Sequence, residues 1–192
     1  MKAKLRRLLF YLLLPAAMTA YSQQVKDFSL PNAVDGKTVS LAQFKSYEWL
    51  MLVFTSNECA YDNYYRERLA LLGAAYRQSV PLLLINAHPE PSESLAAMQL
   101  KYRQWALDVP YLADKQQVVM TLLEAKKSPE VFLLRKKDGL YTVMYRGSID
   151  DNPQVPGDVD RSYLKEAIDS LTAGKKPEWS TTRPVGCTIR KK

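Results

Sequence analysis

Continuous apolar runs alternate with segments of helical periodicity through the first half of the chain. Leu50–Phe54 and Val80–Ile85 predict strands that are buried on both faces, because their apolar residues are not interrupted by alternating polar ones. Tyr61–Gln78 has apolar residues at helical spacing and predicts a long helix after the first run. A second helix is predicted to begin near Ser92, with an apolar stripe of Leu95, Met98, Tyr102 and Trp105.

The pattern changes in the second half of the chain. A short helix is predicted at Gln116–Leu123, with Asp114 as its candidate cap. Two strand-like runs follow, Val131–Leu134 and Leu140–Tyr145, and Asp138-Gly139 lies between them. Asp-Gly between two such runs is a strong signal for a tight β-hairpin.

A last helix is predicted after Asp160, its candidate cap, and before Gly174, with Leu164, Ala167, Ile168 and Leu171 facing inward. The order of elements predicts an α/β fold with a mixed central sheet and helices on both of its faces. An extended segment with short strands precedes this sheet, and an irregular tail follows it. We therefore divide the chain into a leader at 1–22, one domain at 23–174 and a tail at 175–192.

The first 22 residues resemble a secretory signal peptide. Lys2, Lys4, Arg6 and Arg7 form a basic start, Leu8–Met18 is apolar, and Ala20-Tyr21-Ser22 offers small residues at a cleavage site. The apolar run is shorter than the roughly 20 residues of a relaxed transmembrane helix, although an uncleaved signal anchor stays open as an alternative. The sequence thus predicts export to a periplasmic or extracellular compartment, where disulfides persist. Membrane association is expected only if the leader is not removed.

Composition excludes several classes of function. Four of the 27 basic residues and none of the 20 acidic ones lie in the leader, so the remaining chain is only mildly basic and does not indicate nucleic-acid binding. One histidine and two cysteines cannot complete a four-ligand zinc site. The chain has no Walker loop, dinucleotide fingerprint or haem attachment motif. We therefore expect neither a metal nor an organic cofactor.

Cys59 is the residue most suggestive of chemistry. It lies between the first predicted strand and the first predicted helix, where helix N–H groups and the helix dipole favour an anion. Because the thiolate is the reactive form of cysteine, this position favours reactivity. The only other cysteine is Cys187, in the tail. The pair is interpreted as redox-active, and a structural disulfide or two unrelated thiols remain alternatives.

The order of elements, with a cysteine after the first central strand, resembles the thioredoxin superfamily. The opening Asp27–Pro31 and the turn Phe54–Cys59 are similar to the start and the reactive turn of redoxin domains. Ser128-Pro129 resembles the cis-proline segment of the superfamily. Tyr145–Asn152 and the late Gly186-Cys187 resemble a peroxiredoxin-like branch, grouped with the alkyl hydroperoxide reductase/thiol-specific antioxidant family.

The chain departs from its relatives around the thiol. Asp62 stands where a CxxC motif has its second cysteine, and Ala60 stands where the branch has proline. Ser56 fits the hydroxyl position of the peroxiredoxin pattern, but Leu52 replaces the proline of that pattern. Glu58 and Asp62 are read as negative charges that oppose ionisation of the thiol.

The resemblance implies an exported thiol-dependent oxidoreductase that acts on a peroxide or a protein disulfide and uses an external thiol as reductant. Cys59 would be the nucleophile and Cys187 the resolving residue, from a tail able to reach the site within one chain or between two. The supporting residues would be Ser56, Asn57, Pro129, Arg68 and Arg146, with the arginines stabilising a thiolate or oxyanion. His88 is interpreted as a loop residue. A redox-inactive binding module and a permanent Cys59–Cys187 bond are the alternatives.

Overall fold

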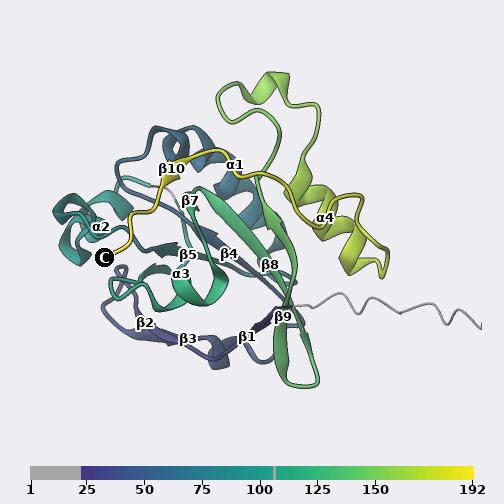
Figure 1. The fold of residues 1–192 in the computed structure, drawn as a ribbon, viewed down its shortest axis with the longest axis horizontal. Coiled ribbons are helices and arrows are strands. Elements are labelled where there is room, and N and C mark those ends of the chain that lie inside the picture. The colour runs from purple at the N-terminus through teal and green to yellow at the C-terminus, as the bar shows by residue number, and fades with distance from the viewer. Residues whose placement is uncertain (1–22, 106) are drawn as a thin grey trace, which may run out of the picture.

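A six-stranded mixed sheet forms the centre of the computed structural model, which describes residues 23–105 and 107–192 (Figure 1). The predicted leader lies outside these residues. The strands follow the order β1-β9-β8-β4-β5-β6. Strands β4, β5 and β6 are parallel, whereas β8 is antiparallel to β4 and β9, and β9 to β1, which confirms the predicted mixed sheet. Their bounds are β1 Gln24–Val25, β4 Trp49–Phe54, β5 Leu82–Asn86, β6 Tyr111–Ala113, β8 Glu130–Lys137 and β9 Leu140–Gly147.

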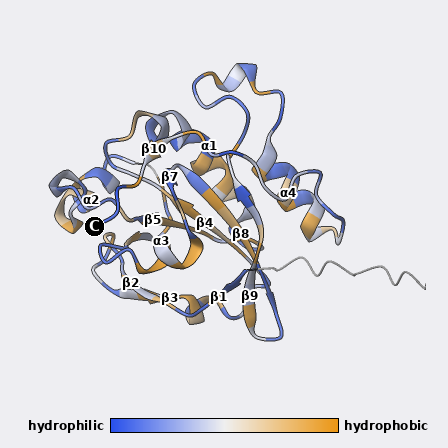
Figure 2. Ribbon diagram, viewed as in Figure 1, coloured by the Kyte–Doolittle hydropathy of each residue, from blue (hydrophilic) through white to orange (hydrophobic). Residues whose placement is uncertain are grey.

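Helices cover both faces of the sheet, and β4 is therefore buried on both of its sides. Met51 and Val53 pack in one apolar cluster with residues of α1 (Ala60–Tyr76), α2 (Leu95–Tyr102) and α4 (Tyr163–Thr172). Leu52 and Phe54 belong to the opposite cluster, with α3 (Val118–Leu123) and the small hairpin of β2 (Ser29–Pro31) and β3 (Thr38–Ser40). Figure 2 shows the hydrophobic residues concentrated along the central strands. The predicted layering is confirmed.

The β8–β9 hairpin forms at the predicted position. Asp138 and Gly139 have φ values of 53° and 82°, and they connect the paired residues Lys137 and Leu140. Two successive residues with positive φ are the requirement of the tight turn that matches the twist of the strands.

Some boundaries differ from the expectation. Strand β6 was not predicted, because a three-residue strand is too short to show a period. Ser94, not Ser92, caps α2, and Ser92 lies in the 3-10 turn η2 (Pro91–Glu93). Asp160 does not cap α4, which begins after Ser162. The N-cap residue of α3 is Gln117, but Asp114 does bind the first turn of the helix: its carboxylate accepts the backbone N–H groups of Val118 and Met120.

The tail carries one short strand. After α4, the chain passes the start of α1 and forms β10 (Cys187–Thr188), which pairs with β7 (Lys127–Ser128) outside the main sheet (Figure 1). Two further 3-10 turns are η1 (Leu41–Phe44) and η3 (Pro156–Asp158). None of the helices between residue 23 and the C-terminus, residue 106 excepted, is long and apolar enough to cross a membrane.

Candidate functional site

Cys59 is the N-cap residue of α1, at the predicted turn between a buried strand and a helix. Its backbone is extended, with φ −71° and ψ 124°, and its carbonyl accepts the N–H groups of Asp62 and Asn63. Only 4% of the residue is exposed. The thiol position therefore lies at the positive end of a 17-residue helix, in a buried environment.

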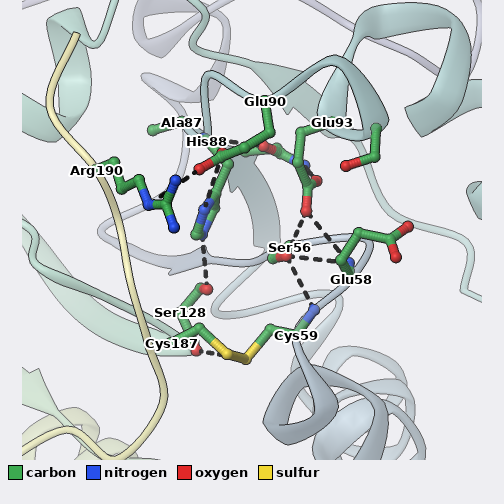
Figure 3. A network of polar contacts seen from close by, with 12 residues as sticks. Ser56, Glu58, Cys59, Ala87, His88, Glu90, Glu93, Ser128, Cys187 and Arg190 are labelled. Carbon is green, nitrogen blue, oxygen red and sulfur yellow. Dashed lines mark hydrogen bonds and ion pairs between the residues drawn. A yellow bond between two sulfur atoms is a disulfide. The ribbon is translucent and has the colours of Figure 1, made fainter.

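Cys187 is bonded to Cys59 within the same chain (Figure 3). The two Cα atoms are 6.0 Å apart, although 128 positions separate them in the sequence. Cys187 lies opposite Ser128 in the antiparallel β7–β10 pair, and the Ser128 carbonyl oxygen lies 3.3 Å from Cys59 Sγ. The structure thus brings together the two cysteines that the sequence singled out.

The tail is held on both sides of the bonded cysteine. Before it, the Thr182 hydroxyl lies 2.7 Å from the Tyr145 hydroxyl and accepts the backbone N–H of Ser148. After it, Ile189 is 5% exposed within the apolar cluster that contains α3, and its N–H donates to the Lys126 carbonyl at 2.9 Å. The position of the tail therefore does not depend on the disulfide alone.

The turn before Cys59 is organised by Glu93, a buried residue of η2. The Glu93 carboxylate accepts the Ser56 hydroxyl at 2.5 Å, the N–H of Asn57 at 2.8 Å and the N–H of Glu58 at 3.2 Å. The Ser56 oxygen in turn accepts the N–H of Cys59 at 3.0 Å. Because a hydroxyl has one proton, Ser56 in this state donates to Glu93 and not to a sulfur or a peroxide.

Asn57 connects the turn to the sheet. Its amide donates to the Ser92 carbonyl, and its side-chain oxygen accepts the Tyr111 hydroxyl at 2.9 Å. Asn86 donates both to that hydroxyl and to Glu93. Nothing in the sequence identified Glu93, since its partners in the turn lie about 36 positions away.

Asp62 lies buried at the third position after Cys59. The Thr55 hydroxyl donates to its Oδ1 at 2.7 Å, while its Oδ2 has no hydrogen-bond partner among the described residues. Burial raises the pKa of this carboxyl well above its ordinary value and outweighs the hydroxyls of Thr55 and Ser128, which lower it; the charge of Glu93 makes a smaller contribution in the raising direction. The reading of Asp62 as a negative charge beside the thiol is therefore revised, because burial favours its neutral form.

His88 follows β5 in a loop, as expected, but it is buried. Its Nε2 lies 2.8 Å from the Ser128 hydroxyl, and its Nδ1 lies 3.7 Å from a carboxylate oxygen of Glu90. Burial lowers the pKa of the imidazole, against the opposing charges of Glu93 and Glu90. His88 thus contacts the segment that carries the disulfide (Figure 3).

A cavity of about 400 Å³ opens beside the disulfide. Three carboxylates, Glu58, Glu90 and Glu93, line it together with one cationic side chain, Arg190, which faces Glu90 at 3.6 Å. With His88 favoured in its neutral form, the cavity wall has an excess of negative charge. The remaining lining residues are Ser56, Cys59, His88, Ser92, Cys187 and Thr188.

The other predicted site residues have distinct positions. The Ser128–Pro129 peptide bond is cis, as the resemblance implied. Arg146 pairs with Glu130 at 2.9 Å, and Arg68 forms an ion pair with Asp150; neither arginine lines the cavity beside the disulfide. Over the part of the chain that the structure describes, no cluster of three or more His, Cys, Asp or Glu side chains is arranged to hold a metal ion.

Comparisons with known proteins agree with this fold. The chain is similar to the structure of hypothetical protein SMc02350 from Sinorhizobium meliloti 1021, with 29% identity, a TM-score of 0.80, and coverage of 89% of this chain and 94% of the other. An uncharacterized conserved protein from Geobacillus kaustophilus matches with 26% identity, a TM-score of 0.80, and coverage of 89% and 92%. The exposed lipoprotein thioredoxin Etrx1 from Streptococcus pneumoniae strain TIGR4, at 17% identity, a TM-score of 0.59, and coverage of 75% and 99%, shares the fold.

No curated protein matches the sequence significantly. The family model described as AhpC/TSA family matches residues 21–149, which is more than half of the chain and includes the turn of Cys59 and the segment of Pro129. The fold is thioredoxin-like, and the turn of Cys59 lies next to the cis-proline segment. The chain therefore belongs to the AhpC/TSA family.

Proposed function

We propose that the protein is a thiol-dependent oxidoreductase in which Cys59 and Cys187 form an exchangeable redox pair. One observation carries this proposal. The turn has no second cysteine, because Asp62 stands at that position, and Cys187 from a distant segment of the chain bonds to the Cys59 sulfur instead. Cys59 would be the nucleophile, since the start of α1 favours its thiolate. Cys187 would be the resolving residue.

Disulfide exchange at this pair balances without a cofactor. The Cys59 thiolate attacks a substrate disulfide, forms a mixed disulfide and releases the first substrate thiolate, which takes a proton from solvent. The Cys187 thiolate then attacks Cys59 Sγ, forms the observed bond and releases the second substrate thiolate. The substrate is reduced by two electrons, and an external dithiol restores both cysteines by the reverse exchange.

The surroundings of Cys59 favour a disulfide over a peroxide as the substrate. A peroxide would need a hydrogen-bond donor or a cation beside the sulfur, but Ser56 donates to Glu93, and Arg68 and Arg146 are paired elsewhere. A protein disulfide needs an edge that receives an extended chain. Strand β7 has such an edge beside the sulfur, and the tail strand β10 occupies it in this structure. Peroxide reduction through a sulfenic acid on Cys59 is the second candidate.

We further propose that the protein works outside the cytosol. The leader-like residues 1–22 and a disulfide between the only two cysteines both fit an oxidising compartment. N-terminal sequencing of the protein isolated from its host should begin at Gln23, and an intact Met1 on cytosolic protein would contradict export.

The function is tested by turnover of a model protein disulfide and of hydrogen peroxide, with a small dithiol as reductant. Cys59→Ser should abolish turnover, whereas Cys187→Ser should still form a mixed disulfide but fail to release it. The rival reading, a permanent structural bond, predicts that the Cys59–Cys187 bond resists reduction at glutathione-range potentials. Turnover by Cys59→Ser equal to that of the parent would remove Cys59 from the mechanism.

A further inference from the structure

The bonded tail segment is in contact with the protein along its length. Cys187 pairs with Ser128 and Thr188 with Lys127, and the Ile189 N–H extends the ladder to the Lys126 carbonyl. The side chains alternate as in a strand: the Cys187 sulfur reaches Cys59, Thr188 is exposed, and Ile189 enters the apolar cluster beside α3. The segment is therefore fixed by backbone bonds, one sulfur and one apolar anchor.

Gly186 fits where no other residue would. A Cβ atom at this position would lie 2.1 Å from the Ser128 carbonyl oxygen, 2.6 Å from its carbon and 2.9 Å from the Pro129 nitrogen. These are backbone atoms of the segment that carries β7, so they cannot move aside as a flexible side chain would. The φ of Gly186 lies outside the left-handed region, so the glycine is required by space and not by backbone conformation. By contrast, a Cβ at Gly157 would meet nothing within 4 Å.

We propose that the edge of β7 beside Cys59 recognises extended protein segments of the pattern Gly-Cys-Xaa-aliphatic, and that the tail is the resident occupant of this site. This inference rests on the proposed function, for which it names a substrate class. A partner cysteine that bonds Cys59 from the β7 edge meets the same Ser128–Pro129 backbone at the preceding residue. It also places the second residue after the cysteine at the apolar position of Ile189. The pattern thus follows from the shape of the site.

The exchange that loads a partner onto this site is a simple disulfide exchange. The Cys59 thiolate attacks the partner cysteine of a disulfide, a bond forms between the two sulfurs, and the other half of the partner disulfide leaves as a thiolate. The partner segment then occupies the edge of β7 in place of the tail. Return of the tail, with Cys187 attacking Cys59, would release the partner as a thiol.

The test uses the full chain with Cys187→Ser and three peptides whose cysteine is activated as a mixed disulfide with thionitrobenzoate. The peptides are Pro-Val-Gly-Cys-Thr-Ile, the same sequence with alanine for glycine, and the same sequence with serine for isoleucine. Release of thionitrobenzoate reports bond formation with Cys59. A Cβ clash with backbone of this severity should slow the alanine peptide by roughly ten- to a hundredfold relative to the glycine peptide, and loss of the apolar anchor should slow the serine peptide.

A second measurement tests, in the intact chain, the lack of space for a side chain at position 186. Gly186→Ala should lower the effective concentration of Cys187 at Cys59 in glutathione redox buffers by roughly tenfold or more. The matched control is Val185→Ala, an adjacent exposed position, which should leave it unchanged.

The outcomes separate this inference from the proposed function. If the three peptides react at equal rates, or none reacts while a small aromatic disulfide does, the recognition proposal is overturned and a nucleophilic Cys59 stands. If the small disulfide does not react either, the proposed function itself fails. If Gly186→Ala leaves the effective concentration of Cys187 at Cys59 unchanged, the requirement for glycine before the cysteine is overturned, whatever the peptides do.

Discussion

The buried carboxyl of Asp62 should make the stability of this protein depend on pH in an unusual direction. The residue is 3% exposed, one of its oxygens has no hydrogen-bond partner among the described residues, and its neighbour Glu93 adds negative charge. Burial raises the pKa of Asp62 in the folded state by more than the hydroxyls of Thr55 and Ser128 lower it, and the charge of Glu93 raises it further. Asp62→Asn keeps the shape and the acceptor for Thr55, and it removes the proton.

The sign of the effect follows from proton binding. Above its ordinary value of 3.8, the Asp62 carboxyl loses its proton in the unfolded chain but keeps it in the folded one. The folded state then binds more protons, so the free energy of unfolding falls as the pH rises, until the pH passes the folded-state pKa. The slope from one group is at most about 1.4 kcal/mol per pH unit. Asp62→Asn has no carboxyl at this position, so its free energy of unfolding does not fall for this reason. The difference in stability between the variant and the parent should therefore shift in favour of the variant as the pH rises from 3.8 to the folded-state pKa of Asp62.

Urea unfolding of the oxidised proteins between about pH 4 and pH 8 measures this difference. Burial also shifts the pKa values of His88 and Asp114, but both groups are present in parent and variant, so their contributions largely cancel in the difference. Asp158→Asn is the matched control, because Asp158 is exposed and, within the described residues, its carboxylate has no ion pair or hydrogen bond that the substitution would remove. A free-energy difference between Asp62→Asn and the parent that stays constant across the range would refute the reasoning.

Three further predictions concern the turn, the cavity and a distant arginine. Glu93→Gln replaces one carboxylate oxygen by an N–H donor, so either the Asn57 N–H and the Asn86 amide or the Ser56 hydroxyl and the Glu58 N–H lose that acceptor, and the free energy of unfolding should fall by about 2–4 kcal/mol in urea titrations. Because Glu58 and Glu90 also line the cavity, cystamine should react with reduced Cys59 about tenfold faster than glutathione disulfide at low salt, and a ratio independent of salt would contradict this. Arg68→Met should destabilise the fold by about 3 kcal/mol, because it leaves a buried carboxylate without its cation, yet leave the rate of Cys59 with small disulfides unchanged.

The parts of the fold that the sequence predicts are those with a strong local pattern. The uninterrupted apolar run Leu50–Phe54 predicts a strand that is buried on both faces, as observed. The pair Asp138-Gly139 predicts a tight turn from its two residue types alone. Strand β6 has three residues and forms because β5 offers its open edge, so its existence depends on a neighbour and not on its own period.

The candidate site shows the same division. The position of Cys59 was visible because a strand, a cysteine and a helix are consecutive in the chain. Glu93 and His88 could not be found in this way, since each contacts the site across 35 or more positions and neither belongs to a motif. Asp62 was visible as a residue, but its burial, which raises the pKa of its carboxyl, is a tertiary property that the sequence does not show.

The anchoring of the tail bears on whether its disulfide is structural or exchangeable. In a free chain, closing a loop of this length costs roughly 5 kcal/mol of conformational entropy, so a bond that alone held the tail would stabilise the fold considerably. Here Thr182 and Ile189 hold the tail on both sides of Cys187 through hydrogen bonds and apolar packing. Because those contacts do not involve the sulfurs, they should persist after reduction as long as no partner segment displaces the tail, and they keep Cys187 beside Cys59 in the free protein. A bond that is not needed to place the tail, between thiols that stay together without it, has the arrangement expected of a resolving pair. Hydrogen exchange of the reduced protein checks this: the Ile189 amide should stay protected, and loss of its protection on reduction would favour the structural reading.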